Sequence, residues 1–217
     1  MANLPRWTHD EMARKVAQDI RDGAYVNLGI GLPTRVANHL PPGREIVLHS
    51  ENGVLGMGPA PAPGCEDPEL INAGKQAVTL LPGGSYFNSA DSFAMMRGGH
   101  LDICVLGAFQ VLVRGDLANW HTGAADAIPA VGGAMDLALG AKQVFVMMEH
   151  LTRSGTSKLV AQCSCPVTAL ACVARVYTDL AVIDVGADGL AVRDLVPGLA
   201  FEELLRLSGV PLAAPTR

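Results

Sequence analysis

The stretch Tyr25-Val26-Asn27-Leu28-Gly29-Ile30-Gly31-Leu32-Pro33 decides which fold the sequence predicts. It begins as a short apolar strand and continues into a turn that contains two glycines. Pro33 stands where a helix can begin, because its fixed φ angle suits the first helical turn and its missing N–H is not needed there. The stretch therefore predicts a strand, a glycine turn and a helix up to Leu40, which is the repeating unit of α/β proteins.

The segments on either side repeat this alternation of helices and strands. Before it, Thr8 and Glu11 have the spacing of a capping box, which predicts a helix that ends at Gly23. After it, residues 45–49 predict a second strand. Further strands are expected at 78–81, 101–106, 110–113, 143–148 and 179–185, and further helices at 89–98 and 201–207. Several strands are apolar on both faces, so the predicted fold class is α/β, with an open, mostly parallel sheet flanked by helices.

Two segments rich in glycine and proline are expected to lie outside these elements. Residues 56–64 predict a surface loop that is a candidate cover for a ligand site, and Pro82-Gly83-Gly84 predicts a turn. The chain has 217 residues, 49% of them hydrophobic, and shows no repeat or low-complexity linker. We therefore expect one domain, 1–217, with flexible ends at about 1–7 and 213–217.

Composition and charge exclude several classes of protein. Sixteen Lys and Arg residues against 21 Asp and Glu give a net charge of −5, which does not suit a nucleic-acid-binding protein. The longest uncharged stretch, 159–174, is shorter than the roughly 18–20 residues of a membrane span. The first residues lack the apolar core of a secretory signal. We expect a cytoplasmic protein that binds neither nucleic acid nor membrane.

The five cysteines and six histidines do not form a recognisable metal or disulfide pattern. The cysteines stand at positions 65, 104, 163, 165 and 172, and no histidine has the spacing of a metal ligand. We therefore expect reduced thiols and no metal site.

A candidate catalytic carboxylate follows the strand predicted at 45–49. Glu51 lies in Ser50-Glu51-Asn52-Gly53, and ligands of open α/β sheets bind beyond the carboxyl ends of the strands. An ionised glutamate is a nucleophile that needs no general base, because its ordinary pKa is about 4.3. From these four residues alone, a solvated turn remains the alternative, since Asn-Gly is a common turn.

Two groups of glycines can be explained either by ligand binding or by local structure alone. Gly29 and Gly31 follow a predicted strand, but G-x-G is either a ligand turn or a packing device, and Thr34 interrupts the longer nucleotide-binding pattern. Gly132 and Gly133 either let a backbone N–H approach a ligand or only mark the entry to a helix.

Five motifs spread over the chain share one further interpretation. They are Asn27–Thr34, Leu48–Gly56, Leu70–Lys75, Ser92–His100 and Gly132–Asp136. Together they resemble the beta-subunit signature of the family I CoA-transferases, over about residues 8–212. In that family the glutamate of Ser-Glu-Asn-Gly is the catalytic nucleophile. The resemblance implies CoA transfer through a covalent glutamyl-CoA thioester on Glu51, with a CoA thioester as substrate and no permanently bound cofactor.

The resemblance also implies the residues around the nucleophile. Gly133 is the candidate oxyanion-hole residue, with Gly132 and Ala134 beside it. The other candidate substrate-binding residues are Asn52, Gly53, Gly29, Gly31 and His121.

The segment after Trp120 is the main clue to the acid that accepts CoA. Ala118–Gly123 and Ile128–Val131 resemble the branch of the family that uses succinyl-CoA and 3-oxoadipate in the breakdown of aromatic compounds. Acetoacetate-using relatives have a shorter segment here. His121 is a candidate partner for the second carboxylate of the acid. The alternatives are a transferase for acetoacetate or another 3-oxoacid, and a non-catalytic CoA-binding or regulatory subunit.

Family I enzymes also have an alpha subunit with a Gly-Gly-Phe-Gly-type CoA motif, and this sequence contains no such motif. We therefore expect a separate alpha subunit and an α₂β₂ assembly. The sequence does not decide whether this chain or the partner supplies the cation that binds the distal carboxylate. The candidates in this chain are Arg35, Lys75, Arg97 and Arg114.

Overall fold

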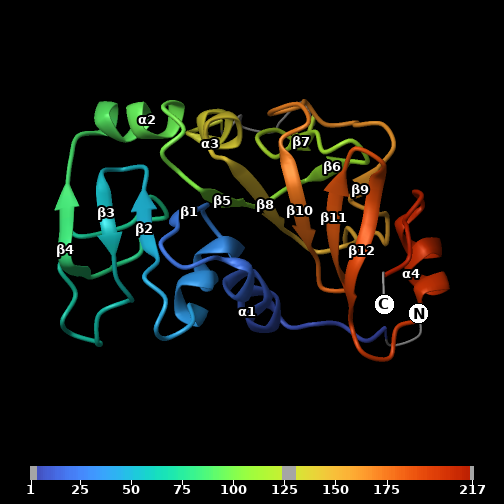
Figure 1. Cartoon of the computed structure of the whole chain (residues 1–217), viewed down its shortest axis with the longest axis horizontal. Helices are drawn as coiled ribbons and strands as arrows, with labels where there is room; N and C mark the ends of the chain where they lie inside the picture. Colours follow the sequence, from blue (N-terminus) through green and yellow to red (C-terminus); the bar gives the residue numbers. More distant parts are fainter. Residues whose placement is uncertain (1–3, 124–130, 216–217) are drawn as a thin grey trace.

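A computed structural model describes residues 4–123 and 131–215 (Figure 1). The elements are α1 (His9–Asp19), β1 (Tyr25–Leu28), the 3₁₀ helix η1 (Leu32–His39), β2 (Val47–Ser50), β3 (Val54–Met57), β4 (Leu80–Tyr86), α2 (Ser89–Arg97), β5 (Ile103–Leu106), β6 (Gln110–Leu112), β7 (Leu117–Ala118), α3 (Ala134–Gly140), β8 (Gln143–Met147), β9 (Leu159–Val160), β10 (Val173–Tyr177), β11 (Ala181–Gly186), β12 (Gly189–Leu195) and α4 (Phe201–Ser208).

The described strands form one large sheet and one small one. The large sheet has nine strands in the order β12-β11-β10-β8-β5-β1-β2-β3-β4, and the small one has the order β7-β6-β9. The centre of the large sheet, from β10 to β2, is parallel. Antiparallel strands extend it at both ends. With its helices, this sheet confirms the expected α/β fold.

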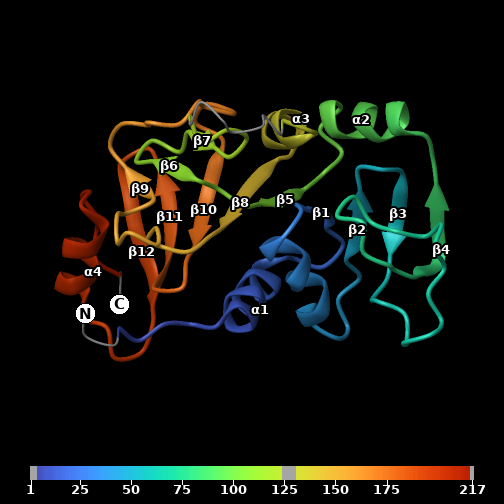
Figure 2. The same ribbon diagram turned by 180° about the vertical axis from the view of Figure 1, so that it is seen from behind.

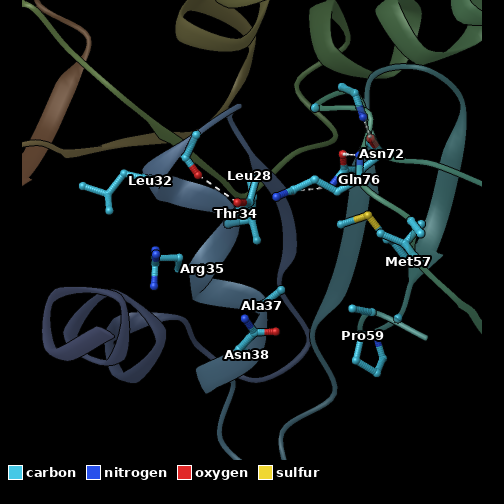
Figure 3. A pocket seen from close by; sticks show the side chains of 18 of the residues that line it. Leu28, Leu32, Thr34, Arg35, Ala37, Asn38, Met57, Pro59, Asn72 and Gln76 are labelled. Atoms are coloured by element: carbon cyan, nitrogen blue, oxygen red, sulfur yellow. Dashed lines mark hydrogen bonds between the residues drawn. The ribbon is translucent and has the colours of Figure 1, made fainter. Parts of the chain in front are cut away.

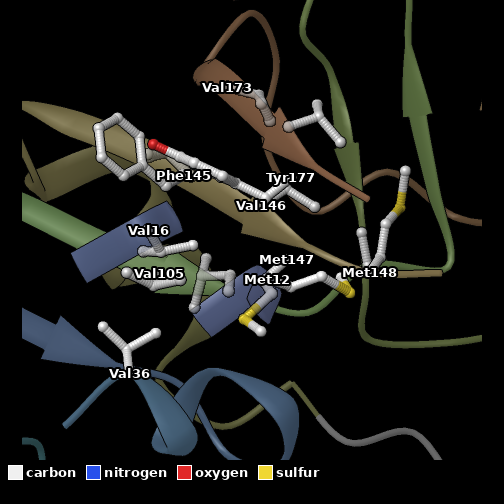
Figure 4. Packing of buried hydrophobic residues seen from close by; sticks show 14 of the residues in the cluster. Met12, Val16, Val36, Val105, Phe145, Val146, Met147, Met148, Val173 and Tyr177 are labelled. Atoms are coloured by element: carbon white, nitrogen blue, oxygen red, sulfur yellow. The ribbon is translucent and has the colours of Figure 1, made fainter. Parts of the chain in front are cut away.

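Helix α1 packs on the centre of the sheet. Its capping box is present, since the Thr8 side chain accepts from the Glu11 N–H and the Glu11 carboxylate accepts from the Thr8 N–H. Met12 and Val16 are fully buried and lie against strand residues such as Val105 (Figure 4). The 3.6-residue spacing of these side chains is what directs them all to the sheet.

Figures 1 and 2 show how the elements divide the molecule. Helices α2 and α3 lie next to each other along one edge, above β2 and β5. The antiparallel strand pair β3–β4 is at one end of the long axis, and β11, β12, α4 and both chain termini are at the other. The first described residues are anchored at that end, since Trp7 is buried and its N–H donates to the Asp179 carbonyl. The Ala213 N–H likewise donates to the Leu190 carbonyl.

The structure corrects the prediction of a turn at Pro82-Gly83-Gly84. These residues lie within β4, where the stretch from Leu80 to Ser85 faces only Met57 to Leu55 of β3. The glycines and proline therefore form a bulge in a strand. Such a bulge is tolerated because β4 is the outermost strand, where a proline costs no ladder hydrogen bond.

Five further strands of the described residues were not predicted, namely β3, β7, β9, β10 and β12. All but β9 pair antiparallel with a neighbouring strand, whereas β9 is parallel to β6 and β10 is also parallel to β8. None of the helices in the described ranges is long and apolar enough to cross a membrane.

Candidate active site

Glu51 directly follows β2, at the carboxyl end of the parallel part of the sheet. The turn that carries it closes with a hydrogen bond from the Gly53 N–H to the Ser50 carbonyl. Gly53 has a φ of +111°, and a Cβ there would lie 2.0 Å from the Phe87 carbonyl oxygen. Only glycine fits this position, so the Asn-Gly pair holds the glutamate at a sharp bend.

A cavity of about 390 Å³ opens at Glu51, and we call it the Glu51 cavity. The carboxyl ends of β1 and β5 form one side of it and the start of α3 forms another. Its lining residues are Asn27, Leu28, Gly29, Ile30, Glu51, Ala73, Leu106, Gly107, Ala108, Phe109, Asn119, Val131, Gly132, Gly133, Ala134 and Leu137. Ile30 and Phe109 are 64% and 40% exposed. The mouth of the cavity therefore has an apolar rim.

The carboxylate of Glu51 lies directly against the backbone of Gly133. A Cβ on Gly133 would lie 2.1 Å from Glu51 Oε2 and 3.5 Å from Phe93 Cζ. Gly133 is the N-cap of α3, and Gly132 before it has a φ of +46°. The glycine pair therefore begins a helix and also leaves room for the close approach of the Glu51 carboxylate.

Burial and charge both act on Glu51. Burial raises the pKa of its carboxyl above the usual range, and the nearby charge of Asp136 raises it further. Asp136 stands in the first turn of α3, and its Oδ1 accepts from Arg97 Nε at 2.6 Å. In the described part of the chain, no group hydrogen-bonds or ion-pairs with the Glu51 carboxylate. The glutamate is thus half-buried and unpaired, which favours its reaction with a ligand.

His49 lies in the interior beside this site. Asn27 Nδ2 donates to His49 Nδ1 at 3.0 Å, so the ring carries its proton on Nε2 and donates to Ser92 Oγ at 3.0 Å. Burial lowers the pKa of the ring to about 4. This neutral histidine joins β1, β2 and α2 and does not enter the Glu51 cavity.

A second cavity, of about 570 Å³, adjoins the first (Figure 3). We call it the η1 cavity, because η1 forms one wall and includes Thr34, Arg35 and Asn38. Leu28 and Ala73 line both cavities. The loop from Asn72 to Gln76 forms the opposite wall, and Asn72 Nδ2 donates to Gln76 Oε1 at 3.1 Å.

The structure brings together only some of the expected site residues. Gly29, Gly132, Gly133 and Ala134 line the Glu51 cavity with Glu51, whereas Gly31 lines the η1 cavity. Asn52 points elsewhere, since its Nδ2 donates to the Ile71 carbonyl. Gly53 supports the turn. His121 is not among the residues that line the Glu51 cavity; its ring lies beside Trp120 and its Nδ1 accepts from the Gly123 N–H. Of the expected segment Ile128–Val131, residues 128–130 fall outside the described residues, and Val131 lines the Glu51 cavity.

Sequence reasoning missed three polar residues at or near this site. Asn27 and Asn119 line the Glu51 cavity, and Asp136 acts on the pKa of Glu51. Asn27 of β1 pairs with His49 of β2, two residues before Glu51. Only this strand pairing shows that Asn27 lies near the site.

The candidate cations for a distal carboxylate differ in their surroundings. Arg35 at the η1 cavity pairs with Asp10, Arg97 with Asp136, and Arg114 with Asp116. Lys75 is exposed in the 72–76 loop, which lines the η1 cavity, and has a φ of +61°. No Lys or Arg lines the Glu51 cavity within the described ranges. The described residues also contain no group of three or more side chains suited to a metal ion, and all five cysteines are free.

Comparison with known proteins identifies the class. The sequence pattern of the coenzyme A transferase family matches residues 9–206. The chain therefore belongs to the coenzyme A transferase family, a family of transferases. It is 68% identical to the beta subunit of the 3-oxoadipate CoA-transferase of Pseudomonas putida, over 98% of this chain and 99% of that one.

Two further relatives extend the comparison. The beta subunit of a probable succinyl-CoA:3-ketoacid coenzyme A transferase of Bacillus subtilis is 49% identical over 89% of each chain. Among solved structures, the acyl-CoA transferase YdiF of Escherichia coli O157:H7 superposes with a TM-score of 0.73 at 18% identity. That match covers 99% of this chain and 43% of YdiF, and at this identity it shows the fold alone.

Proposed function

We propose that this chain carries the nucleophile of an enzyme that moves CoA from succinyl-CoA to 3-oxoadipate, in the breakdown of aromatic compounds. The observation that carries the proposal is the half-buried Glu51 carboxylate, which has no partner among the described residues and lies against Gly133. The 68% identity to one subunit of a 3-oxoadipate CoA-transferase supports the choice of acid.

The proposed reaction is a double displacement on Glu51. The carboxylate attacks the thioester carbonyl of succinyl-CoA, which gives a succinyl-glutamyl anhydride and CoA thiolate. The thiolate then attacks the glutamyl carbonyl, releases succinate and leaves a glutamyl-CoA thioester. 3-Oxoadipate enters through the same two steps in reverse. The raised pKa of Glu51 makes the ionised carboxylate a stronger nucleophile than an exposed one.

Gly133 is a better candidate oxyanion donor than Ala134. The Ala134 N–H donates to the Val131 carbonyl at 3.1 Å and is therefore occupied. The Gly133 N–H has no acceptor among the described residues, and its α-carbon faces the carboxylate. A backbone donor placed where the negative charge develops stabilises each tetrahedral intermediate.

The two adjoining cavities suit an elongated thioester. The reacting carbonyl would lie in the Glu51 cavity, and the rest of the CoA chain would extend into the η1 cavity past Leu28 and Ala73. We propose that an alpha subunit supplies the remaining CoA contacts in an α₂β₂ enzyme, since the two transferases compared above are each named as one subunit of an enzyme. A cytoplasmic location stays a prediction.

Trapping of the intermediate tests the role of Glu51. The assembled enzyme is incubated with succinyl-CoA and no acceptor, then treated with borohydride, which reduces a thioester carbonyl to an alcohol. Peptide mass mapping should find the reduced side chain at Glu51 and nothing at that position in the Glu51→Gln control. A succinyl group found on the exposed Cys65 in a sample mapped without borohydride would instead indicate thiol chemistry.

Two rate comparisons test the acid and the partner. The assembled enzyme should use 3-oxoadipate faster than acetoacetate, and a preference for acetoacetate would favour the 3-ketoacid alternative. The chain alone should be close to inactive until an alpha subunit is added, because remote CoA contacts contribute much of the rate. Full activity without a partner would contradict this part of the proposal.

A further inference from the structure

Glu51 and Gly133 reach each other from separate parts of the chain. Glu51 follows β2, whereas Gly133 begins α3. No described backbone hydrogen bond joins the two segments. The gap between the carboxylate and the Gly133 backbone therefore depends on whatever holds α3 in place.

Helix α2 holds α3 at two points (Figures 1 and 2). At the far end of α3, a Cβ on Gly140 would lie 2.0 Å from the Met96 carbonyl oxygen, so the two backbones touch. Nearer the site, Arg97 Nε donates to Asp136 Oδ1 at 2.6 Å. The Arg97 guanidinium also lies 5.6 Å from the centre of the Phe93 ring, and that ring packs against Gly133.

We propose that Arg97 and Asp136 are positioning residues, whose ion pair fixes the Gly133 backbone against the Glu51 carboxylate. This inference rests on the proposed role of Glu51 as the nucleophile. A misplacement of about 1 Å in such a site lowers the rate about 100-fold. Neither residue contacts the reacting atoms, so both act through α3.

The pair also sets the charge that Glu51 experiences. The charged and titratable groups on the described elements around Glu51 are Asp136 on α3, Arg97 and Asp91 on α2, His49 on β2, Lys75 on the 72–76 loop, Tyr25 on β1 and Cys104 on β5. Among them, Asp136 raises the pKa of Glu51, and Arg97 offsets that charge. Removal of the arginine should raise the pKa of Glu51 further, and neutralisation of the aspartate should lower it.

Kinetics of the assembled enzyme with succinyl-CoA and 3-oxoadipate test this pair. Arg97→Met should lower kcat about 10- to 100-fold with less than a threefold change in KM, and it should move the acidic limb of the kcat profile to higher pH. Asp136→Asn should move that limb to lower pH. Arg97→Lys should recover part of the rate. A merely structural role would not shift the two limbs in opposite directions.

The matched control is Arg206→Met, which removes an equally exposed arginine from its pair with Glu203 on α4. It should leave kcat and the pH profile unchanged. Unshifted acidic limbs and a kcat within twofold of wild type in both Arg97→Met and Asp136→Asn would overturn the inference. If Arg97→Met does not assemble, Asp136→Asn and Arg97→Lys decide it alone. Glu51→Gln separates the two proposals, because its activity reports only on the nucleophile.

Discussion

The two borders of the parallel centre of the large sheet treat a half-buried carboxylate in opposite ways. Near β10, the Asp19 carboxylate accepts from Arg175 Nη1 and from the Tyr177 hydroxyl, each at 2.7 Å. Near β2, Glu51 has no such partner among the described residues, and its pKa is raised. An unpaired carboxylate away from water costs stability, whereas a paired one holds the fold together. Under the proposed function, this difference separates a region that serves catalysis from a region that serves stability.

Side chains are also more deeply buried in the region of β10 to β12 than in the region of β3 and β4. In the β10–β12 region, Val176, Ala181 and Ile183 are fully buried. In the β3–β4 region, Tyr86 is 63% exposed and Leu81 is 43% exposed. The comparison predicts that substitutions near Glu51 change the rate and that substitutions near β11 change the stability.

Glu51→Gln should produce the largest effect. The substitution keeps the size of the side chain but removes the anionic nucleophile, so turnover should fall about 10⁴-fold or more. Steady-state rates of the assembled enzyme measure it. Urea unfolding should show no loss of stability, because no described partner of Glu51 is lost. A residual rate above about a tenth of wild type, or about 1.4 kcal/mol, would remove Glu51 from the mechanism.

Gly133→Ala should have the next largest effect on the rate. The added methyl group would lie 2.1 Å from Glu51 Oε2, although the φ of −84° accepts alanine without backbone strain. We expect kcat to fall about 10²- to 10³-fold through displacement of the carboxylate from its oxyanion donor. Gly107→Ala is the matched control, since Gly107 lines the same cavity but a Cβ there meets nothing within 4 Å. Equal rates in the two variants would contradict the close contact.

Ile183→Ala tests the other region. Ile183 is fully buried in β11, so the cavity left by its side chain should lower the free energy of unfolding by about 2–5 kcal/mol. Urea unfolding measures this loss. The kcat of the folded enzyme at low temperature should match wild type. A large fall in kcat with unchanged stability would show that the two regions are not separate in function.

The two buried histidines should contribute similar amounts to the pH dependence of stability. His49 near the site and His150 near β10 are buried, and burial lowers the pKa of each to about 4. The unfolded chain binds protons near pH 6.5 and the folded chain does not, so stability is present above pH 6.5 and is lost as the pH falls toward 4. Each histidine should account for a loss of about 3 kcal/mol in the free energy of unfolding over that range.

Urea unfolding between pH 4 and 7 checks this expectation. The variants His49→Gln and His150→Gln should each lose less stability on acidification than wild type. Three parallel curves would exclude these histidines as the source of acid sensitivity.

The sequence predicts most directly those elements whose cause lies within a few adjacent residues. The capping box of Thr8 and Glu11 is local and was predicted from the sequence. The bulge in β4 depends on pairing with β3, which the sequence of Pro82-Gly83-Gly84 does not reveal. The strands β10 and β12 were also missed, although each pairs with β11 across a short connection, as in the pairs Tyr177–Val182 and Gly186–Gly189.

In the candidate site too, contiguous motifs were predicted and contacts made by the fold were not. Ser-Glu-Asn-Gly and Gly-Gly-Ala are contiguous motifs, so Glu51 and Gly133 were identified as candidates before their contact was visible. Asp136 follows Gly133 by less than one helical turn, but only the fold brings its charge near Glu51. His121 was proposed from a difference between branches of the family, and the structure orients its Nδ1 toward the Gly123 N–H.

The bulge in β4 also affects how the chain behaves in solution. An outermost strand exposes backbone groups that invite edge-to-edge association into aggregates. Here Pro82 has no N–H to offer, and Gly83 beside it has a φ of +86°, outside the extended conformation. A second chain could not continue a regular ladder across these residues. We therefore expect a freshly synthesised chain to resist fibril formation through this edge.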